Sequence, residues 1–330
     1  MKNIIYLNNS IHYNKIMNIE SLQKAGSFHH EIKEKVIKQV QYTNDIQSLC
    51  NFIENEIKCY SSDYETNHGI AFPVGLNKNE VVAHYNPLKN EPNIIFDLDV
   101  DILKIDYGIH INGNIVDEAF SVTNNPKLFP LINSSKDALR NMIKELRPDM
   151  RISSLGKMCE EIVKSYEIEV RPGLFVPVKP INNVTGHTID PWNIHGKKLV
   201  YNINNNSTNI VEENETYALE VYTTDGTGTS IMDTTHISHY SVINTNNKEK
   251  LNSESLAFLE YLDTQFRGLA FSPRQIHYTN YYTNHLELIE NLYNNNNIKK
   301  YPVLVEPLCI AHVAQFEKTI YVGESQSIVI

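Results

Sequence analysis

Several stretches of the chain carry apolar residues at helical spacing. Residues 18–41 are predicted to form a helix, because apolar side chains recur there every three to four positions, at Ile32, Val36, Ile37 and Val40. A second helix is predicted to start at Asn44 or Asp45 and to end near residue 59. Further helices are predicted for residues 133–147, 155–166, 252–267 and 282–293. Ser153 or Ser154 is a candidate cap for the second of these.

In other stretches the apolar residues are clustered or alternate with polar ones, a pattern that predicts strands. They are residues 69–73, 102–122, 211–222 and 312–323. Within the second stretch, Asn112-Gly113 separates two apolar runs, and this dipeptide is typical of a two-residue hairpin. No Gly/Ser-rich or Pro-rich linker divides the chain. The expected organisation is therefore one domain over residues 18–330, preceded by a short extension of residues 1–17.

Charge and composition narrow the class of protein. The 330 residues carry a formal net charge of −10 and have a pI of about 5.7, so no global positive field favours nucleic acid or an anionic membrane. No segment approaches the ~20 apolar residues that cross a bilayer, and the apolar run at the start is too short for a secretory signal. The four cysteines form no Cys-x-x-Cys pair. We expect a cytoplasmic protein without nucleic-acid or membrane partners.

The predicted hairpin carries two aspartates whose positions suggest a metal site. In a two-residue hairpin centred on Asn112-Gly113, Gly108 lies opposite Asp117, and Asp106 shares the face of Gly108. Asp106 and Asp117 are then diagonal neighbours, roughly 7–8 Å apart at the backbone. Two carboxylates at that separation repel each other unless a cation lies between them, and a divalent metal would fill this role. A solvated pair on an exposed face is the alternative.

Two glutamates stand inside predicted strands. Alternation places Glu220 on one face with Ala218 and Tyr222, and it places Glu317 with Gln315 and Thr319. Glutamate is disfavoured in the middle of a strand, so two cases invite a functional reason. A solvated strand face is the alternative for each of them.

Three histidines extend this set of candidate residues. His187 follows Gly186, and His195 precedes Gly196, in a stretch with Gly, Pro and Trp that is expected to be a loop. His84 follows the apolar run Val81-Val-Ala. A lone histidine is more often structural than catalytic. Three histidines and four carboxylates together are typical of a metallohydrolase, provided that the fold brings them together.

A faint internal repeat adds a hint about architecture. Leu49-Cys50-x-x-Ile53 resembles Met158-Cys159-x-x-Ile162, and each lies in the second helix of a predicted pair that precedes a strand. Chance is one explanation. The other is a duplicated unit of two helices and strands, whose halves would face each other across a central cleft.

Beyond these patterns, the chain resembles the type 2 methionine aminopeptidases in an ordered series of motifs. The motifs are Gly69-Ile-Ala-Phe-Pro-Val-Gly75, Val82-Ala-His-Tyr85, Lys104-Ile-Asp-Tyr-Gly-x-His-Ile-x-Gly-x-Ile-Val-Asp117, Gly186-His-Thr-Ile189 with Ile194-His195, Tyr217-Ala-Leu-Glu220, Ser238-His-Tyr240, Gly268-Leu-Ala-Phe271 and Ala314-Gln-Phe-Glu-Lys-Thr319. The resemblance implies an α+β "pita-bread" fold, which is a curved antiparallel sheet flanked by helix pairs with pseudo-twofold symmetry. The long interval between Glu220 and Glu317 implies the helical insertion of type 2, at about residues 250–300.

The resemblance also implies a set of site residues and a reaction. The five metal ligands of the family fall on Asp106, Asp117, His187, Glu220 and Glu317. Two divalent ions (Co, Mn, Fe or Zn) would activate water for attack on the carbonyl of the first residue. His84, His195 and Glu220 would be the catalytic side chains, with Glu220 as the proton shuttle. The methionine side chain would lie in a pocket formed by Phe72, Ile194, His239 and Ala270, together with His84 and His195.

Partners and rivals follow from the same resemblance. The expected substrate is the N-terminal methionine of a nascent protein whose second residue is small, and the expected state is a monomer. Ribosome association stays open, because the short extension of residues 1–17 replaces the long charged tail of better-known members. One rival is a proline-directed aminopeptidase or prolidase, which carries an additional N-terminal domain. Another is a non-catalytic pita-bread protein that binds RNA or ribosomes, for which intact ligands and a pI of about 5.7 are atypical.

Overall fold

The structure is a computed structural model that describes residues 17–59, 67–277, 283–324 and 326–330. The predicted extension of residues 1–17 lies outside these ranges, except for Met17. Each predicted helix has a counterpart in the structure. The helices are α1 (Ile19–Gln39), α2 (Ile46–Cys59), α3 (Phe129–Glu145), α4 (Ile152–Val163), α5 (Ser253–Phe266), α6 (Pro273–His277) and α7 (His285–Asn294), with a 3₁₀ turn, η2, at Pro126–Leu128.

The helix starts show which capping predictions hold. Asp45 caps α2, because its Oδ1 accepts a hydrogen bond of 2.6 Å from the backbone N–H of Ser48. The prediction of Ser153 or Ser154 as the cap of α4 is wrong, since Arg151 occupies that position and makes no side-chain capping bond. Ser153 instead lies inside the helix and donates its hydroxyl to the carbonyl of Ser207. A distant loop thus takes the hydrogen bond that local propensity assigned to the cap.

Most strands belong to three antiparallel sheets. Their orders are β1–β3–β4; β14–β13–β10–β8–β9, with β7 paired to β10; and β11–β12–β2. The strands are β1 (His68–Lys78), β2 (Val81–Ala83), β3 (Leu103–Ile111), β4 (Asn114–Val122), β5 (Glu167–Arg171), β6 (Leu174–Pro177), β7 (Lys179–Pro180), β8 (Thr185–Ile189), β9 (Leu199–Tyr201), β10 (Thr216–Thr224), β11 (Ile231–Val242), β12 (Ile298–Val305), β13 (Val313–Val322) and β14 (Ser327–Val329). The predicted hairpin at Asn112-Gly113 is present, with φ angles of 51° and 82° that suit a turn with two left-handed residues.

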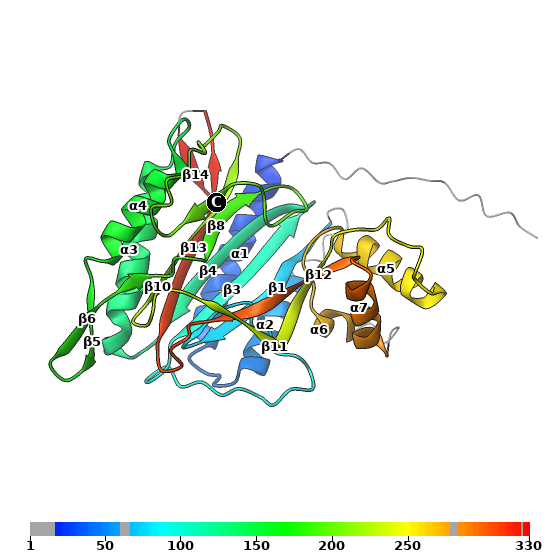
Figure 1. Cartoon of the computed structure of the whole chain (residues 1–330), viewed down its shortest axis with the longest axis horizontal. Coiled ribbons are helices and arrows are strands. Elements are labelled where there is room, and N and C mark those ends of the chain that lie inside the picture. Colours follow the sequence, from blue (N-terminus) through cyan, green and yellow to red (C-terminus); the bar gives the residue numbers. More distant parts are fainter. Residues whose placement is uncertain (1–16, 60–66, 278–282, 325) are drawn as a thin grey trace, which may run out of the picture.

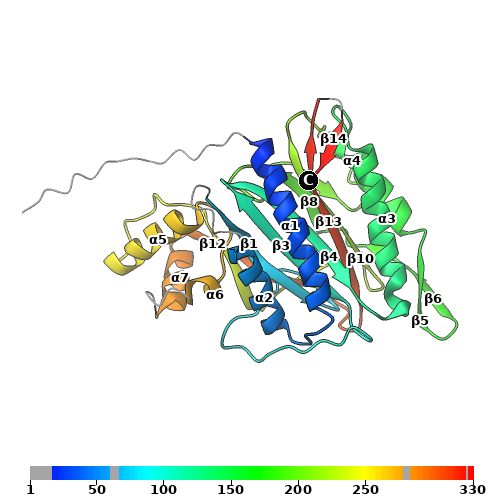
Figure 2. The ribbon, with the colours of Figure 1, turned by 180° about the vertical axis from the view of Figure 1, so that it is seen from behind.

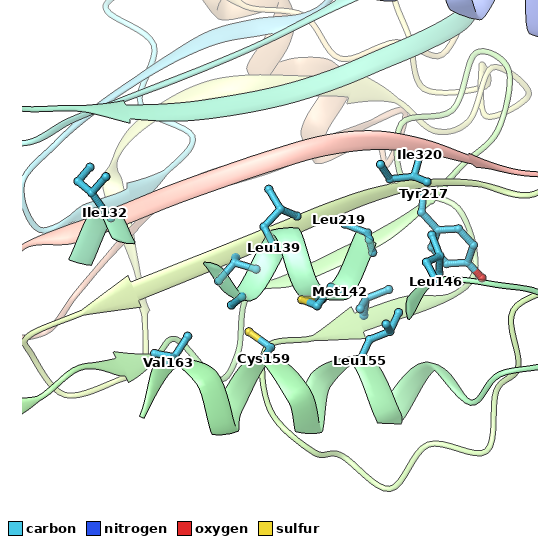
Figure 3. Close-up of a cluster of buried hydrophobic side chains, with 14 of the residues drawn as sticks. Ile132, Leu139, Met142, Leu146, Leu155, Cys159, Val163, Tyr217, Leu219 and Ile320 are labelled. Carbon is cyan, nitrogen blue, oxygen red and sulfur yellow. The ribbon is translucent and has the colours of Figure 1, made fainter. Parts of the chain in front are cut away.

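Four helices cover one face of the sheets, as Figure 2 shows from behind. The first pair, α1 and α2, packs on β1, β3 and β4, while α3 packs on β10 and β13 with α4 beside it. The apolar side chains between α3, α4 and these two strands form the buried cluster of Figure 3, which includes Met142, Cys159, Leu219 and Ile320. Burial of these side chains holds the helix pairs against the sheet. The opposite face of the sheets is turned toward the viewer in Figure 1.

The three remaining helices form a separate layer at one edge of the molecule. In Figure 1, α5, α6 and α7 lie beside β11 and β12. Their apolar side chains share a buried cluster with Phe72 and Ala270. No helix in the described parts of the chain is both long and apolar enough to cross a membrane.

The internal repeat corresponds to matching contacts in the two halves. Cys50 of α2 lies 3.4 Å from the side-chain amide of Asn86, which also donates to the carbonyl of Val74. Cys159 of α4 lies 3.5 Å from Asn202, whose amide donates to the carbonyl of Val184. Each half therefore joins its second helix to a strand segment through a buried Cys–Asn pair. This equivalence favours duplication over chance as the origin of the repeat.

Candidate metal centre

The β3–β4 hairpin positions the two aspartates. The register pairs Gly108 with Asp117 and Asp106 with Ala119, as the sequence predicted, so the two carboxylates are diagonal neighbours on one face. Both side chains line the same cavity. Asp117 is 4% exposed, which excludes the alternative of a solvated pair.

Two further carboxylates come from the β10–β13 pair. Glu220 lies directly opposite Glu317 in the register, an arrangement that is repulsive when both are charged. Thr319 joins this pair to the aspartates, because its hydroxyl accepts from the N–H of Asp117 and donates to its carbonyl, both at 2.8 Å. Strand β13 is thus locked beside β4, and four carboxylates from two sheets share one cavity.

His187 completes the cluster from β8. Sequence reasoning placed this histidine in a loop, which is wrong: Thr185–Ile189 pairs with β10 on one side and β9 on the other. Its Nδ1 lies 3.2 Å from the carbonyl of Thr188, to which it donates, so Nε2 carries a lone pair and lies 3.8 Å from Asp117 Oδ2. Asp117, His187 and Glu317 each offer a ligand atom within 4.8 Å of the others.

The pKa values of all four carboxyl groups are raised above their usual range. Burial raises the pKa of Asp106 to about 6 and that of Glu220 to about 8. Burial first, and then the charges of the neighbouring carboxylates, raise the pKa of Asp117 and Glu317 well above the usual range. Burial also lowers the pKa of His187 to about 4, so the imidazole is neutral at physiological pH. Negative charge at this site is therefore unstable without a compensating cation.

The donor set fits divalent metal ions. Asp106 Oδ1 is buried and has no hydrogen-bond partner among the described residues, while its Oδ2 accepts from Gln315 at 3.1 Å. An unpartnered carboxylate oxygen next to three other carboxylates and one neutral imidazole is a donor set for a hard or borderline cation. Such an ion would satisfy the oxygen and compensate the repulsion between Glu220 and Glu317.

The cavity continues from the carboxylates into an apolar compartment. The whole cavity, with its charged and apolar parts together, measures about 230 Å³, and the predicted pocket residues Phe72, Ile194, His239 and Ala270 all line it. The four belong to β1, the loop after β8, β11 and the segment before α6. The apolar part is smaller than the whole cavity, so it accommodates only a small part of a substrate, such as one side chain.

Two more histidines, His84 and His195, line the same cavity. His84 has a left-handed backbone with a φ of 68°, and its Nδ1 lies 3.0 Å from the carbonyl of Pro302. His195 packs edge-on against His187 at 4.5 Å between ring centroids. Burial lowers the pKa of both rings, so both are neutral bases or donors at physiological pH. All eleven residues predicted for the site line this one cavity.

Sequence reasoning missed several residues that line the cavity. Tyr222 lies on the predicted polar face of β10, and its hydroxyl accepts a hydrogen bond of 2.7 Å from Gln315. Alternation along the strands already placed Tyr222 on the face of Glu220 and Gln315 on the face of Glu317. This was the sequence signal that could have identified them. Tyr301 and Leu304 belong to β12, which the sequence did not predict because β11 and β12 carry too few alternating apolar residues.

The model of metallopeptidase family M24 matches residues 20–239, about two thirds of the chain. The chain belongs to this family. The chain is therefore a hydrolase of a family that uses divalent metal ions, and its carboxylate–histidine cluster is a candidate site for such ions. The matched span includes Asp106, Asp117, His187 and Glu220, and Glu317 lies beyond its end.

Curated relatives match almost the whole metallopeptidase chain. It is 32% identical over 311 residues to methionine aminopeptidase 2-2 of Chaetomium globosum, a match that covers 92% of this chain and 70% of the relative. It is 30% identical over 309 residues to methionine aminopeptidase 2 of Encephalitozoon intestinalis, a match that covers 93% of this chain and 85% of the relative.

Solved structures confirm the expected fold. The metallopeptidase superposes on a thermophilic Arx1 with a TM-score of 0.73 at 16% identity, over 95% of this chain and 91% of that one. It superposes on methionine aminopeptidase from Thermotoga maritima with a TM-score of 0.60 at 14% identity, over 96% of this chain and 98% of that one. At these identities the similarity concerns architecture, and it confirms the pita-bread prediction.

Proposed function

We propose that this metallopeptidase removes the initiator methionine from nascent proteins, as a type 2 methionine aminopeptidase. The observation that carries the proposal is the opening of the buried carboxylate–histidine cluster directly onto a small apolar pocket. The charged compartment suits the free amine and the peptide bond of a chain terminus. The apolar compartment suits one methionine side chain. The names of the relatives support the same activity.

Five side chains would hold two divalent ions. Asp117 and Glu317 would be shared, Asp106 would belong to one ion, and His187 and Glu220 would belong to the other. When bound, such ions acidify water and polarise the carbonyl that is attacked. Co, Mn, Fe and Zn all accept this mixture of carboxylate and imidazole.

Glu220 is the proposed proton shuttle. Its carboxyl group lines the cavity directly opposite Glu317, among the side chains that would hold the ions and the attacking water, so it is placed to accept and pass on a proton. It would take a proton from the attacking water and deliver it to the leaving amine. Tyr222 hydrogen-bonds to Glu220, which orients the carboxyl group within the cavity.

His84 and His195 would orient the scissile amide. Because His84 Nδ1 donates to Pro302, only its Nε2 is left to contact the substrate. A neutral His195, buried between His187 and Tyr301, offers the second contact. Both rings lie at the border of the apolar pocket, where the peptide bond after the first residue would lie.

The pocket residues would select methionine. A thioether packs favourably against aromatic rings, and Phe72 and His239 supply such rings on the wall of the cavity. The carboxylates would attract the free N-terminal amine, which restricts cleavage to the first residue. A small second residue is expected, because His84 and His195 crowd the position after the bond.

The wider setting belongs to the same proposal. We infer that residues from 18 onward act as one catalytic unit, with α5–α7 as the type 2 insertion, and that the enzyme works as a cytoplasmic monomer on chains that emerge from ribosomes. A proline-directed peptidase of the same fold is the second candidate, since the ligand types are shared. A binding protein without activity is less consistent with four buried carboxylates whose charges need a cation.

The test is hydrolysis by chelator-stripped protein with and without added Mn or Co. The substrates are Met-Ala-Ser, Leu-Ala-Ser and Ala-Pro-Ser, and mass spectrometry identifies the products. Metal-dependent release of methionine alone is the expected result. Cleavage of Ala-Pro-Ser would move the protein to the proline-directed branch, and no cleavage under any metal would favour a binding protein.

A matched pair of variants separates the site from the rest of the chain. Glu220→Gln removes the proposed shuttle without changing size, and it should reduce kcat by at least about a hundredfold. Glu161→Gln makes the same chemical change on the exposed face of α4, where the side chain is 68% exposed, and should leave kcat unchanged. Equal rates for the two variants would contradict the role of Glu220.

A further inference from the structure

The ring of His239 in the apolar pocket is bonded to the protein at both nitrogens. Its Nδ1 lies 3.1 Å from the hydroxyl oxygen of Ser238, and its Nε2 lies 3.2 Å from the carbonyl oxygen of Pro73. The ring is 6% exposed and stands 5.5 Å from the ring of His84. No ring nitrogen of His239 is therefore left for a ligand in the pocket.

These contacts define which nitrogen carries the hydrogen. A carbonyl oxygen can only accept, so Nε2 must donate to Pro73. The Ser238 hydroxyl has one hydrogen and two possible acceptors, His239 Nδ1 and the carbonyl of His84, each 3.1 Å away. If the hydroxyl donated to the carbonyl of His84 instead, its oxygen would have to accept a hydrogen bond from Nδ1. Both ring nitrogens of His239 would then carry a hydrogen, and the ring would be a cation. Burial and the neighbouring His84 hold the pKa of His239 well below its usual value, so the ring is neutral and Ser238 donates to Nδ1.

Ser238 is itself held by a buried network. The backbone N–H of Asn86 donates to its hydroxyl at 3.1 Å, and the side chain of Asn86 accepts from Ser272 at 2.8 Å and donates to Val74 at 2.9 Å. Asn86, Ser238 and Ser272 are all fully buried. Asn86 after β2 thus links the Ser238 hydroxyl of β11 to Ser272 before α6. A hydroxyl held this way has little freedom to turn away from His239.

We propose that Ser238 is a positioning residue that fixes His239 as a neutral ring with hydrogen on Nε2, so that the pocket offers only ring surface to the first side chain of the substrate. This inference rests on the proposed function, since it concerns the selection of methionine. His84 differs from His239 in having Nε2 left for polar contact. The pocket then rejects a first residue that needs a hydrogen bond, such as glutamine, because its amide would be buried without a partner.

The decisive measurement is ¹⁵N NMR of the histidine rings in the full chain, loaded with diamagnetic Zn²⁺ near neutral pH. The variant His239→Gln identifies the signals of His239. The expected pattern is a protonated Nε2 and an unprotonated Nδ1 whose resonance shifts downfield in Ser238→Ala and returns in Ser238→Thr. A protonated Nδ1 in the wild type, or no shift in Ser238→Ala, would overturn the proposal. Neither result depends on whether the protein cleaves methionine.

The second measurement compares kcat/KM for Met-Ala-Ser and Gln-Ala-Ser. Ser238→Ala frees Nδ1 to bond a polar side chain, so the preference for methionine should fall about fivefold, mainly through KM, and Ser238→Thr should restore it. Ser255→Ala is the matched control, because Ser255 is also fully buried and its hydroxyl has no partner among the described residues. An unchanged preference in Ser238→Ala would refute the role in selection. Failure of the wild type to release methionine would refute the proposed function and leave the NMR result to decide on Ser238.

Discussion

Gly108 offers a sharp test of how the pocket is built. It lies in β3, and a Cβ atom added there would stand 2.2 Å from Cε1 and 2.7 Å from Cδ1 of Phe72, and 3.0 Å from the carbonyl oxygen of Val116. Carbon atoms in contact are normally about 3.5–4.0 Å apart, so the substitution Gly108→Ala must displace the Phe72 ring by more than about 1 Å. Phe72 lines the cavity, and its displacement changes the shape of the pocket.

The magnitude follows from the cost of overpacking. An extra methyl group in a filled site typically costs about 1–3 kcal/mol, which predicts a loss of several degrees in Tm. A ring displaced within the methionine pocket should raise KM for Met-Ala-Ser by about tenfold, equivalent to about 1.4 kcal/mol of binding. The effect on kcat should be smaller, because the nearest atoms to the added Cβ belong to Phe72 and Val116 and not to a proposed metal ligand.

Two further variants complete the experiment. Gly69→Ala is the control, since the nearest atom to its added Cβ is His110 Nε2 at 3.8 Å and no clash arises. In a Phe72→Ala background the clash with the ring disappears and only the 3.0 Å approach to the Val116 carbonyl remains, so Gly108→Ala should then cost much less, and a double-mutant cycle measures the difference. A Gly108→Ala enzyme with wild-type Tm and KM would refute the reasoning, as would equal effects of the substitution in both backgrounds.

Two other outcomes follow from the buried charges. The metal-stripped protein should lose stability as pH rises: folded Asp106 and Glu220 have pKa values of about 6 and about 8, whereas unfolded carboxyls titrate near 4, so the folded state holds more protons across this window. Calorimetry with chelator should show Tm falling from about pH 4 to 8, and added Mn should restore Tm most at the alkaline end; a Tm that rises with pH would contradict this. Arg274→Ala should lower the free energy of unfolding by about 3–5 kcal/mol, because it leaves buried Glu54 without its ion pair. Urea unfolding measures the loss, and replacement of both residues by apolar ones should recover much of it.

Local patterns were sufficient wherever neighbouring residues alone decide the geometry. The Asn112-Gly113 dipeptide predicted the hairpin, and the hairpin register predicted that Asp106 and Asp117 are diagonal neighbours. Alternation placed Glu220 and Glu317 on their buried polar faces. A two-residue turn and the period of a strand need no information from distant parts of the chain.

The same patterns failed where distant segments decide. His187 was expected in a loop, yet it lies in β8, because β9 and β10 supply the hydrogen bonds that make its segment a strand. Strands β11 and β12 carry too few alternating apolar residues for a local prediction and are defined by their pairing with each other, so Tyr301 and Leu304 on the cavity wall were missed with them. The cap of α4 was misplaced because Ser207 takes the hydroxyl of Ser153.

By itself, the sequence determined the identities of the candidate ligands, the face of the strand on which each strand carboxylate lies, and the family that carries them in this order. Only the tertiary structure decided that four carboxylates from two sheets share one cavity, that Thr319 locks Asp117 beside Glu317, and that Ser238 and Pro73 occupy both nitrogens of His239. The physical reason is that periodicity encodes direction along one element. Proximity between elements depends on packing and hydrogen bonds across hundreds of residues, which no local pattern contains.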